Sequence, residues 1–263
     1  MNVMNLPNSR ARLSRVVRDA GDVVQTDRVA QLLEVEHTDA SKLLARWAAQ
    51  GWLKRIGPGI YLPVPIDALE SDRVLADPWI LVPVLFDPGY VSGWSAAEHW
   101  DLTEQIFNDI VVKTCRSLRS RTRKVHGISF VLRHIKEEHL FGTKTRWRGQ
   151  TRVRVADIHR CLIDMLDEPY LGGGIQHVAD CFRNYIRHED SDFTTLVEYA
   201  DKLGNGAIFK RLGFLAEREG VDHLVESCTP YLTTGNAKLD SSIACPRLIT
   251  RWRLLVPDSW ALR

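Results

Sequence analysis

The sequence predicts an α+β fold in two parts, and two observations lead to this prediction. Residues 10–65 read as three short helical segments followed by a β-hairpin, which is the element order of a winged helix-turn-helix. Beyond residue 66, runs with the period-two pattern of strands are mixed with runs at helical spacing, as in an α+β domain. At ~150 residues per domain, a chain of 263 residues has room for both parts. We therefore predict a winged helix-turn-helix domain at residues 1–66 and a larger mixed α+β domain at residues 67–263.

The first two helices follow from apolar spacing and from end signals. In the first, Leu13, Val16 and Val17 recur at helical spacing among arginines, and a glycine follows as a stop. Thr26 is a residue type that caps helices, so we expect a second helix that begins there and ends near Glu34.

The third helix presents a polar face. It opens at His37, carries an apolar stripe, and meets Gly51 as a left-handed stop. The opposite face holds Ser41, Lys42 and Arg46, with Ala45 between the last two, and is polar but small. Such a face suits the major groove of DNA, which is ~12 Å wide and admits one helix. We expect these three residues to contact DNA.

A predicted hairpin completes the N-terminal part. The runs "WLKRI" and "IYLPV" are rich in β-branched and aromatic residues, and "GPG" at residues 57–59 joins them with the chemistry of a tight turn. Lys54 and Arg55 stand just before the turn, where a wing contacts phosphates beside the groove. We predict a winged helix that binds DNA through its third helix. A winged helix that binds only protein is the alternative.

The body combines strands and helices. "TRVRVAD" alternates valine with arginine, as a half-buried strand does, and "ADIHRCLIDMLDEP" follows with apolar residues at helical spacing, closed by Pro169. Arg160 and Asp164 lie four residues apart on this helix and can pair along one turn, for ~0.3–0.5 kcal/mol if exposed. Their simpler interpretation is this structural pair, and the alternative is a surface that binds a partner protein. Further strands are predicted at residues 110–114, 127–135 and 247–257.

Charge is distributed in blocks. The chain has a net charge of +2, yet residues 67–112 carry −8 and residues 113–160 carry +11. The basic block creates a field that attracts phosphate backbones or an acidic protein. Its densest run contains Arg116, Arg119, Arg121, Arg123 and Lys124. Three interpretations stay open for this run: a solvated loop, a second nucleic-acid contact, or a dock for an acidic protein.

Composition indicates a globular protein without a membrane segment. Apolar residues make up 44% of the chain and charged residues 26%. The apolar run at residues 79–86 is far shorter than the ~20 residues that span a bilayer, and the N-terminus lacks the apolar centre of a signal peptide. We expect a cytoplasmic location.

The sequence offers little for catalysis. The glycines of "LGGGIQHVAD" precede a helix and could cradle a phosphate, but the ending of a P-loop is missing, so we predict a connection between helices. The five cysteines form no C-x-x-C pair, and His134 and His139 lie five residues apart, off one helical face. We therefore expect no catalytic residue, no metal site, no cofactor and no disulfide framework.

Four separated phrases, in order, resemble the AbiEi-type family of antitoxins and transcriptional regulators. They are "LLARWAAQGWLKRIGPGIYLPVP", "YVSGWSAAEHWDLTEQIF", "TRVRVADIHRCLIDMLDEPYLGGGIQHVAD" and "LGNGAIFKRLGFLAEREG". In the second phrase Trp100 and Asp101 replace the histidine and glycine that are frequent in the family, so no ligand role is carried over to that site.

The resemblance implies that the protein is the antitoxin of a type IV toxin–antitoxin system, a class of system linked to phage defence. Its N-terminal domain would bind operator repeats and repress its own operon, and its C-terminal domain would counteract a nucleotidyltransferase-like toxin. Two alternatives stay open. An antitoxin that modifies its toxin, for instance by phosphoryl transfer, would change the toxin's mass. A stand-alone winged-helix regulator would lack a neighbouring nucleotidyltransferase-type gene.

Overall fold

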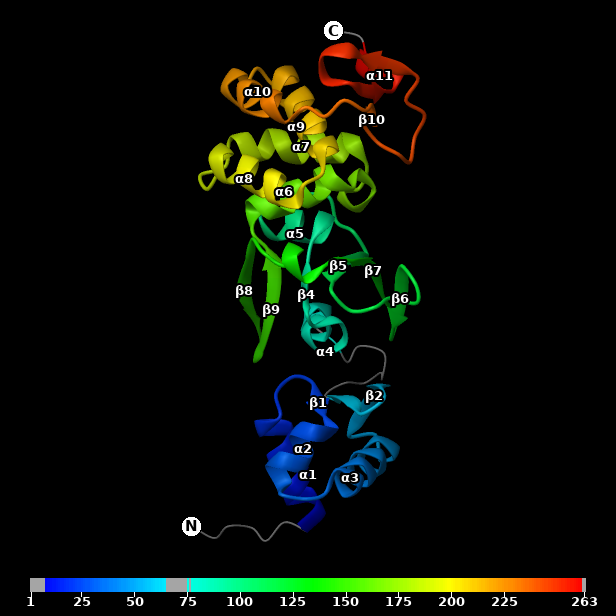
Figure 1. The fold of residues 1–263 in the computed structure, drawn as a ribbon. Helices are drawn as coiled ribbons and strands as arrows, with labels where there is room; N and C mark the ends of the chain where they lie inside the picture. The colour runs from blue at the N-terminus through cyan, green and yellow to red at the C-terminus, as the bar shows by residue number, and fades with distance from the viewer. Residues whose placement is uncertain (1–7, 65–74, 76, 262–263) are drawn as a thin grey trace. The chain divides into compact units, whose positions relative to one another are not determined.

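The computed structural model shows a mixed α+β protein (Figure 1). It describes residues 8–64, 75 and 77–261. The chain divides into two compact units, which we describe one at a time. Unit 1 consists of residues 1–85, 124–128 and 146–153, and unit 2 of the remaining residues. The predicted boundary between residues 66 and 67 falls outside the described residues.

Unit 1 begins with helices and a small sheet. Its elements are α1 (Asn8–Asp19), β1 (Val24–Gln25), α2 (Thr26–Leu33), α3 (His37–Ala49), β2 (Leu53–Gly57) and β3 (Ile60–Pro63). The three predicted helices and the hairpin are confirmed, but β1, which pairs with β3 in the order β1-β3-β2, was not predicted. The core gathers Leu13, Val29, Leu44, Trp47 and Tyr61 from these elements. Of the three apolar residues at helical spacing in α1, Leu13 and Val16 are buried, whereas Val17 is 40% exposed.

The turn of the hairpin is fastened to α2. Thr26 is not the cap that the sequence predicts: Gln25 occupies that position, and no side chain caps the helix. Instead, the Thr26 amide and hydroxyl both donate to the Gly59 carbonyl, at 2.9 and 3.2 Å. Gly59 has a φ of +69°, and a Cβ there would lie 3.0 Å from the Thr26 hydroxyl oxygen. Glycine is therefore required where the turn meets the helix.

Unit 2 contains most of a mixed sheet. The sheet has six strands in the order β6-β7-β5-β4-β9-β8. β5 runs antiparallel to β4 and parallel to β7, and β4 runs parallel to β9. The strands are β4 (Gly89–Val91), β5 (Asp109–Thr114), β6 (Thr122–Val125), β7 (Ile128–His134), β8 (Thr143–Arg148) and β9 (Thr151–Ala156). The predictions for β5, β7 and β9 are confirmed. Part of the basic run, for which a solvated loop was one of three interpretations, forms β6.

A group of helices gathers at one end of this sheet (Figure 1). Helices α5 (Gly93–His99), α6 (Ile158–Asp167), α7 (Ile175–Ile186), α8 (Phe193–Leu203), α9 (Gly206–Arg218) and α10 (Asp222–Cys228) belong to unit 2. Short elements complete the chain: η1 (Pro78–Leu81), α4 (Val82–Phe86), η2 (Glu137–His139), η3 (Pro169–Gly172), η4 (Thr229–Tyr231) and α11 (Asp258–Ala261). None of the helices in the described ranges is long and apolar enough to cross a membrane.

The last predicted strand is broken in two. Residues 247–257 form β11 (Arg247–Ile249), a 3-10 turn η5 (Thr250–Trp252) and β12 (Leu254–Val256), which join β10 (Ala237–Lys238) in the order β10-β12-β11. The break places the Trp252 side chain in the core, and Arg253 adopts a φ of +49° to let the chain resume. A Cβ on Gly213 of α9 would lie 2.0 Å from the Trp252 ring. Gly213 therefore leaves the space that the indole occupies.

We predict that Gly213→Ala destabilises unit 2 by about 1–3 kcal/mol, because the methyl group would displace the Trp252 ring in a packed core. The loss outweighs the gain in helix propensity of up to ~1 kcal/mol. Urea unfolding followed by tryptophan fluorescence measures the change. Gly235→Ala, where nothing lies within 4 Å of the added Cβ, is the control. Equal stability of the two variants would contradict this packing.

Candidate nucleic-acid interface and buried polar network

The exposed face of α3 carries the side chains that the sequence singles out for DNA. Ser41, Lys42 and Arg46 are all exposed, whereas Leu44 and Trp47 are buried on the opposite side of the helix. Lys42 pairs with Asp39 at 3.2 Å, but both side chains are more than half exposed. Such a surface pair contributes little, so a phosphate can replace the carboxylate. Among the described residues, no ion pair involves Arg46.

The hairpin places its two basic residues differently. Arg55 is exposed, and its Nε donates to the Gly57 carbonyl at 3.3 Å. Lys54 is half-buried and has an interaction partner. A bulge between Arg55 and Gly57 turns Ile56 into the core and leaves Arg55 outside. Arg55 is therefore the more accessible of the two predicted wing contacts.

Positive charge also covers α1. The exposed basic residues of this helix are Arg10, Arg12, Arg15 and Arg18. Arg18 pairs with its neighbour Asp19 at 2.8 Å, and hydrogen bonding to Arg18 holds the pKa of the Asp19 carboxyl below its usual value. The described surface of unit 1 thus offers basic side chains on α1, α3 and β2.

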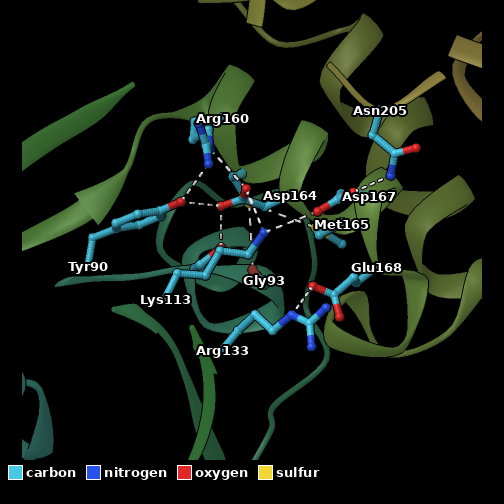
Figure 2. A network of polar contacts seen from close by, with 12 residues as sticks. Tyr90, Gly93, Lys113, Arg133, Arg160, Asp164, Met165, Asp167, Glu168 and Asn205 are labelled. Carbon is cyan, nitrogen blue, oxygen red and sulfur yellow. Dashed lines mark hydrogen bonds and ion pairs between the residues drawn. The ribbon is translucent and has the colours of Figure 1, made fainter. Parts of the chain in front are cut away.

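Arg160 and Asp164 lie in a buried polar network of unit 2 (Figure 2). The predicted pair along α6 is present, with Arg160 Nε 2.9 Å from Asp164 Oδ1, but the two residues are only 0% and 1% exposed. Lys113 of β5 adds a second cation at 2.9 Å from the same oxygen. The other carboxylate oxygen accepts from Ser92 at 2.6 Å and from the Tyr90 hydroxyl at 3.1 Å.

This burial decides between the two interpretations of the pair. A contact with a partner protein needs an exposed side chain, and neither Arg160 nor Asp164 has one. The pair is buried because α6 lies inside unit 2, where the side chains of Tyr90 from β4 and Lys113 from β5 also reach Asp164. Lys113, Tyr90 and Ser92 were not singled out from the sequence, although a lysine at the end of the apolar run "DIVVKT" is a signal for a buried ion pair.

Charge compensation keeps Asp164 ionised. Burial alone raises the pKa of its carboxyl, but Lys113, Arg160 and the Ser92 hydroxyl outweigh burial, and the pKa is lowered overall. Because the folded-state pKa lies below the unfolded value of ~3.9, the stabilisation is present above that value and is lost as the pH falls through the folded pKa. Burial, together with Asp164, raises the pKa of Tyr90 well above its usual value, so this phenol acts as a neutral donor.

The phosphate-cradle interpretation of the glycine run has no support in the structure. Gly173 and Gly174 connect η3 to α7, as the simpler prediction has it. The amide of Ile175 at the start of α7 donates to Asp240 Oδ2 at 3.0 Å, and Asp240 is 1% exposed. A carboxylate of the chain itself thus occupies the place that a bound anion would take.

The Cys181 thiol is buried beside a histidine. Cys181 lies 3.7 Å from His177 Nε2, but burial raises the pKa of this thiol to about 12, so it stays protonated at neutral pH. No group of three histidine, cysteine, aspartate or glutamate residues in the described part of the chain could hold a metal ion.

Unit 2 also contains an open cavity of about 530 Å³. Trp94 and Phe107 form one wall, stacked with ring centroids 4.9 Å apart. Asp109, Tyr170 and Gly173 contribute further parts of the lining. The volume falls within the ~300–1,000 Å³ typical of ligand pockets.

Comparison with known proteins supports the fold only. No family model matches the chain, and no curated protein matches it. Among solved structures, the chain is similar to the crystal structure of the RV2827C protein from Mycobacterium tuberculosis, with a TM-score of 0.67 and 15% sequence identity. The match covers 95% of this chain and 92% of that chain. The two proteins therefore share an architecture across both units.

We predict that Asp164→Asn lowers the free energy of unfolding by about 3–5 kcal/mol, because Arg160 would lose its carboxylate partner in the interior and Lys113 would keep only the more distant Asp167, at 3.7 Å. Urea unfolding at neutral pH measures this change in the free energy of unfolding. Asp180→Asn is the matched control, since Asp180 pairs with Arg183 on the surface of α7, where the side chains are 49% and 41% exposed. That change should cost no more than ~1 kcal/mol. Similar losses in the two variants would show that the buried carboxylate is dispensable.

Proposed function

We propose that this protein is an AbiEi-type antitoxin whose N-terminal winged helix binds operator DNA and whose C-terminal part counteracts a nucleotidyltransferase-like toxin. The observation that carries the DNA-binding part is the exposed face of α3, which presents Ser41, Lys42 and Arg46. This helix is followed in the chain by a hairpin that is tied to α2. Three helices and a hairpin in this order are typical of winged helices that read DNA.

The geometry favours a division of roles among the basic residues. The guanidinium of Arg46 forms no ion pair with another described residue. A guanidinium can donate two parallel hydrogen bonds to the two acceptors that guanine presents in the major groove. Arg55 projects from the hairpin, where it would contact a phosphate and fix the orientation of the protein without reading sequence. The expected target is a set of repeats upstream of the protein's own operon.

The antitoxin part of the proposal rests on the resemblance of four phrases in order, three of them in residues 67–263. The structure gives a physical role to several of their residues. Arg211 of the phrase "RLG" is buried and donates to the carbonyls of Leu166 and Asp167 at the end of α6, and Gly213 makes space for Trp252. These residues build the fold of unit 2, so contact with a toxin must use other, exposed residues.

We predict that Arg46→Ala weakens binding to the operator by about 1–3 kcal/mol and relaxes sequence preference at one base pair. Titration of operator and scrambled duplexes, followed by fluorescence anisotropy, measures both effects. Arg55→Ala is the comparison, because a lost phosphate contact weakens binding to all duplexes and reduces the slope of log K against log salt by about 0.9. If Arg46→Ala weakens binding to every duplex equally, then Arg46 contacts a phosphate and does not read a base.

Growth measurements test the antitoxin proposal. We expect that the gene beside this one encodes a nucleotidyltransferase-like protein that arrests growth when it is expressed alone, and that co-expression of the full-length chain restores growth. The chain and its neighbour are placed under separate inducible promoters, so that repression of the operon plays no part. A toxic neighbour that the chain fails to counteract would refute the antitoxin proposal and leave the DNA-binding proposal standing.

A further inference from the structure

The cavity of unit 2 lies beside an unusually exposed apolar side chain. Ile106 is 81% exposed, the most among the large apolar residues of the described ranges, and it directly precedes Phe107 of the cavity wall. Tyr170, on η3, lines the cavity and is 60% exposed. Exposed apolar and aromatic side chains around a pocket are characteristic of protein-binding surfaces.

The walls of this cavity are preformed. The Trp94 indole nitrogen donates to the Asp109 carbonyl at 2.7 Å, and its ring stacks on Phe107. Phe107 also meets the His177 ring edge-on at 5.2 Å. Gly173 has a φ of +82°, and a Cβ there would lie 2.9 Å from Phe107. Binding would thus require little reorganisation of the cavity.

The segment that presents Ile106 is held at both ends. The Thr103 hydroxyl lies 2.8 Å from His177 Nε2 and bonds to the amide of Gln105 at 3.0 Å. Phe107 is fixed in the cavity wall on the other side. Ile106 projects into solvent between two anchored residues, and a small ligand held inside the cavity would leave it uncovered. A partner with an extended surface would cover both features.

Charge indicates which kind of partner fits. Residues 94–112 contain four carboxylates and neither lysine nor arginine. Glu98, Asp101 and Glu104 are exposed, and Asp109 lies on the cavity wall. None of the four is in an ion pair with another described residue. Aromatic rings combined with an unpaired carboxylate are the groups that bind an ammonium or a guanidinium.

We infer that this surface, formed by Ile106, Tyr170, Asp109 and the Trp94–Phe107 wall, binds a basic protein surface that inserts an arginine or lysine side chain into the cavity. The inference rests on the proposed function, because it takes the toxin to be that partner. The aromatic rings would pack against the alkyl stem and the cationic group, Asp109 would neutralise the charge, and Ile106 would be covered by the surrounding surface.

Binding of the purified neighbouring gene product to full-length variants tests this inference. We expect Tyr170→Ala to bind about tenfold more weakly, as for an aromatic side chain at the centre of an interface. Asp109→Asn, which keeps the backbone carbonyl that holds Trp94, should weaken binding and make it less dependent on salt. Trp147→Ala is the matched control, because Trp147 is also 60% exposed but lies on β8. Urea unfolding of each variant checks that unit 2 is folded.

The outcomes separate this inference from the proposed function. Weaker binding by Tyr170→Ala and Asp109→Asn, with Trp147→Ala unchanged, supports the basic partner. Unchanged binding by both cavity variants would overturn the inference, and so would rescue of growth without measurable binding, while the antitoxin proposal would survive in both cases. If the unmodified chain neither binds the neighbouring protein nor rescues growth, both the inference and the antitoxin proposal fail.

Discussion

The burial of one carboxylate, Asp164, is the constraint on which unit 2 depends. A buried anion is tolerated only when cations and hydrogen-bond donors surround it. Asp164 receives Arg160 from its own helix, but Lys113 comes from β5, and Tyr90 and Ser92 come with β4. Helix α6 can therefore occupy its place only when β4 and β5 are paired beneath it. The network stabilises one arrangement of helix and sheet and makes other packings costly.

The same arrangement positions the surface that we infer to bind a partner. β5 carries Lys113 near one end and Asp109 at the other, and α6 leads into η3, which presents Tyr170. The ion pair between Lys113 of β5 and Asp164 of α6 thus connects the two elements that lead into this surface (Figure 2). In unit 1, the bonds from Thr26 to Gly59 have a comparable effect, since they tie the hairpin to α2. In both units a rigid interior positions an exposed, chemically distinct surface.

Local signals predicted several of the helices and strands, and contacts distant in sequence determined other features. Apolar periodicity and glycine stops are sufficient for α1 to α3, the hairpin, β5, β7, β9 and α6. Thr26 has the chemistry of a cap, yet it bonds to Gly59, 33 residues away. The break around Trp252 depends on the space above Gly213, and the burial of Asp164 depends on Lys113, 51 residues away. The four-residue spacing predicted the Arg160–Asp164 pair but could not show which other residues surround it. No local sequence pattern predicted the cavity around Trp94 and Tyr170.

The central claim is that DNA binding and toxin neutralisation use different surfaces of the chain. Its most direct test measures both activities of full-length Arg46→Ala in one strain, with a reporter under the chain's own upstream region and the toxin under an independent promoter. The account predicts that this variant loses repression of the reporter but restores growth as well as the unmodified chain does. Loss of growth rescue by a folded Arg46→Ala variant would contradict the separation of the two activities.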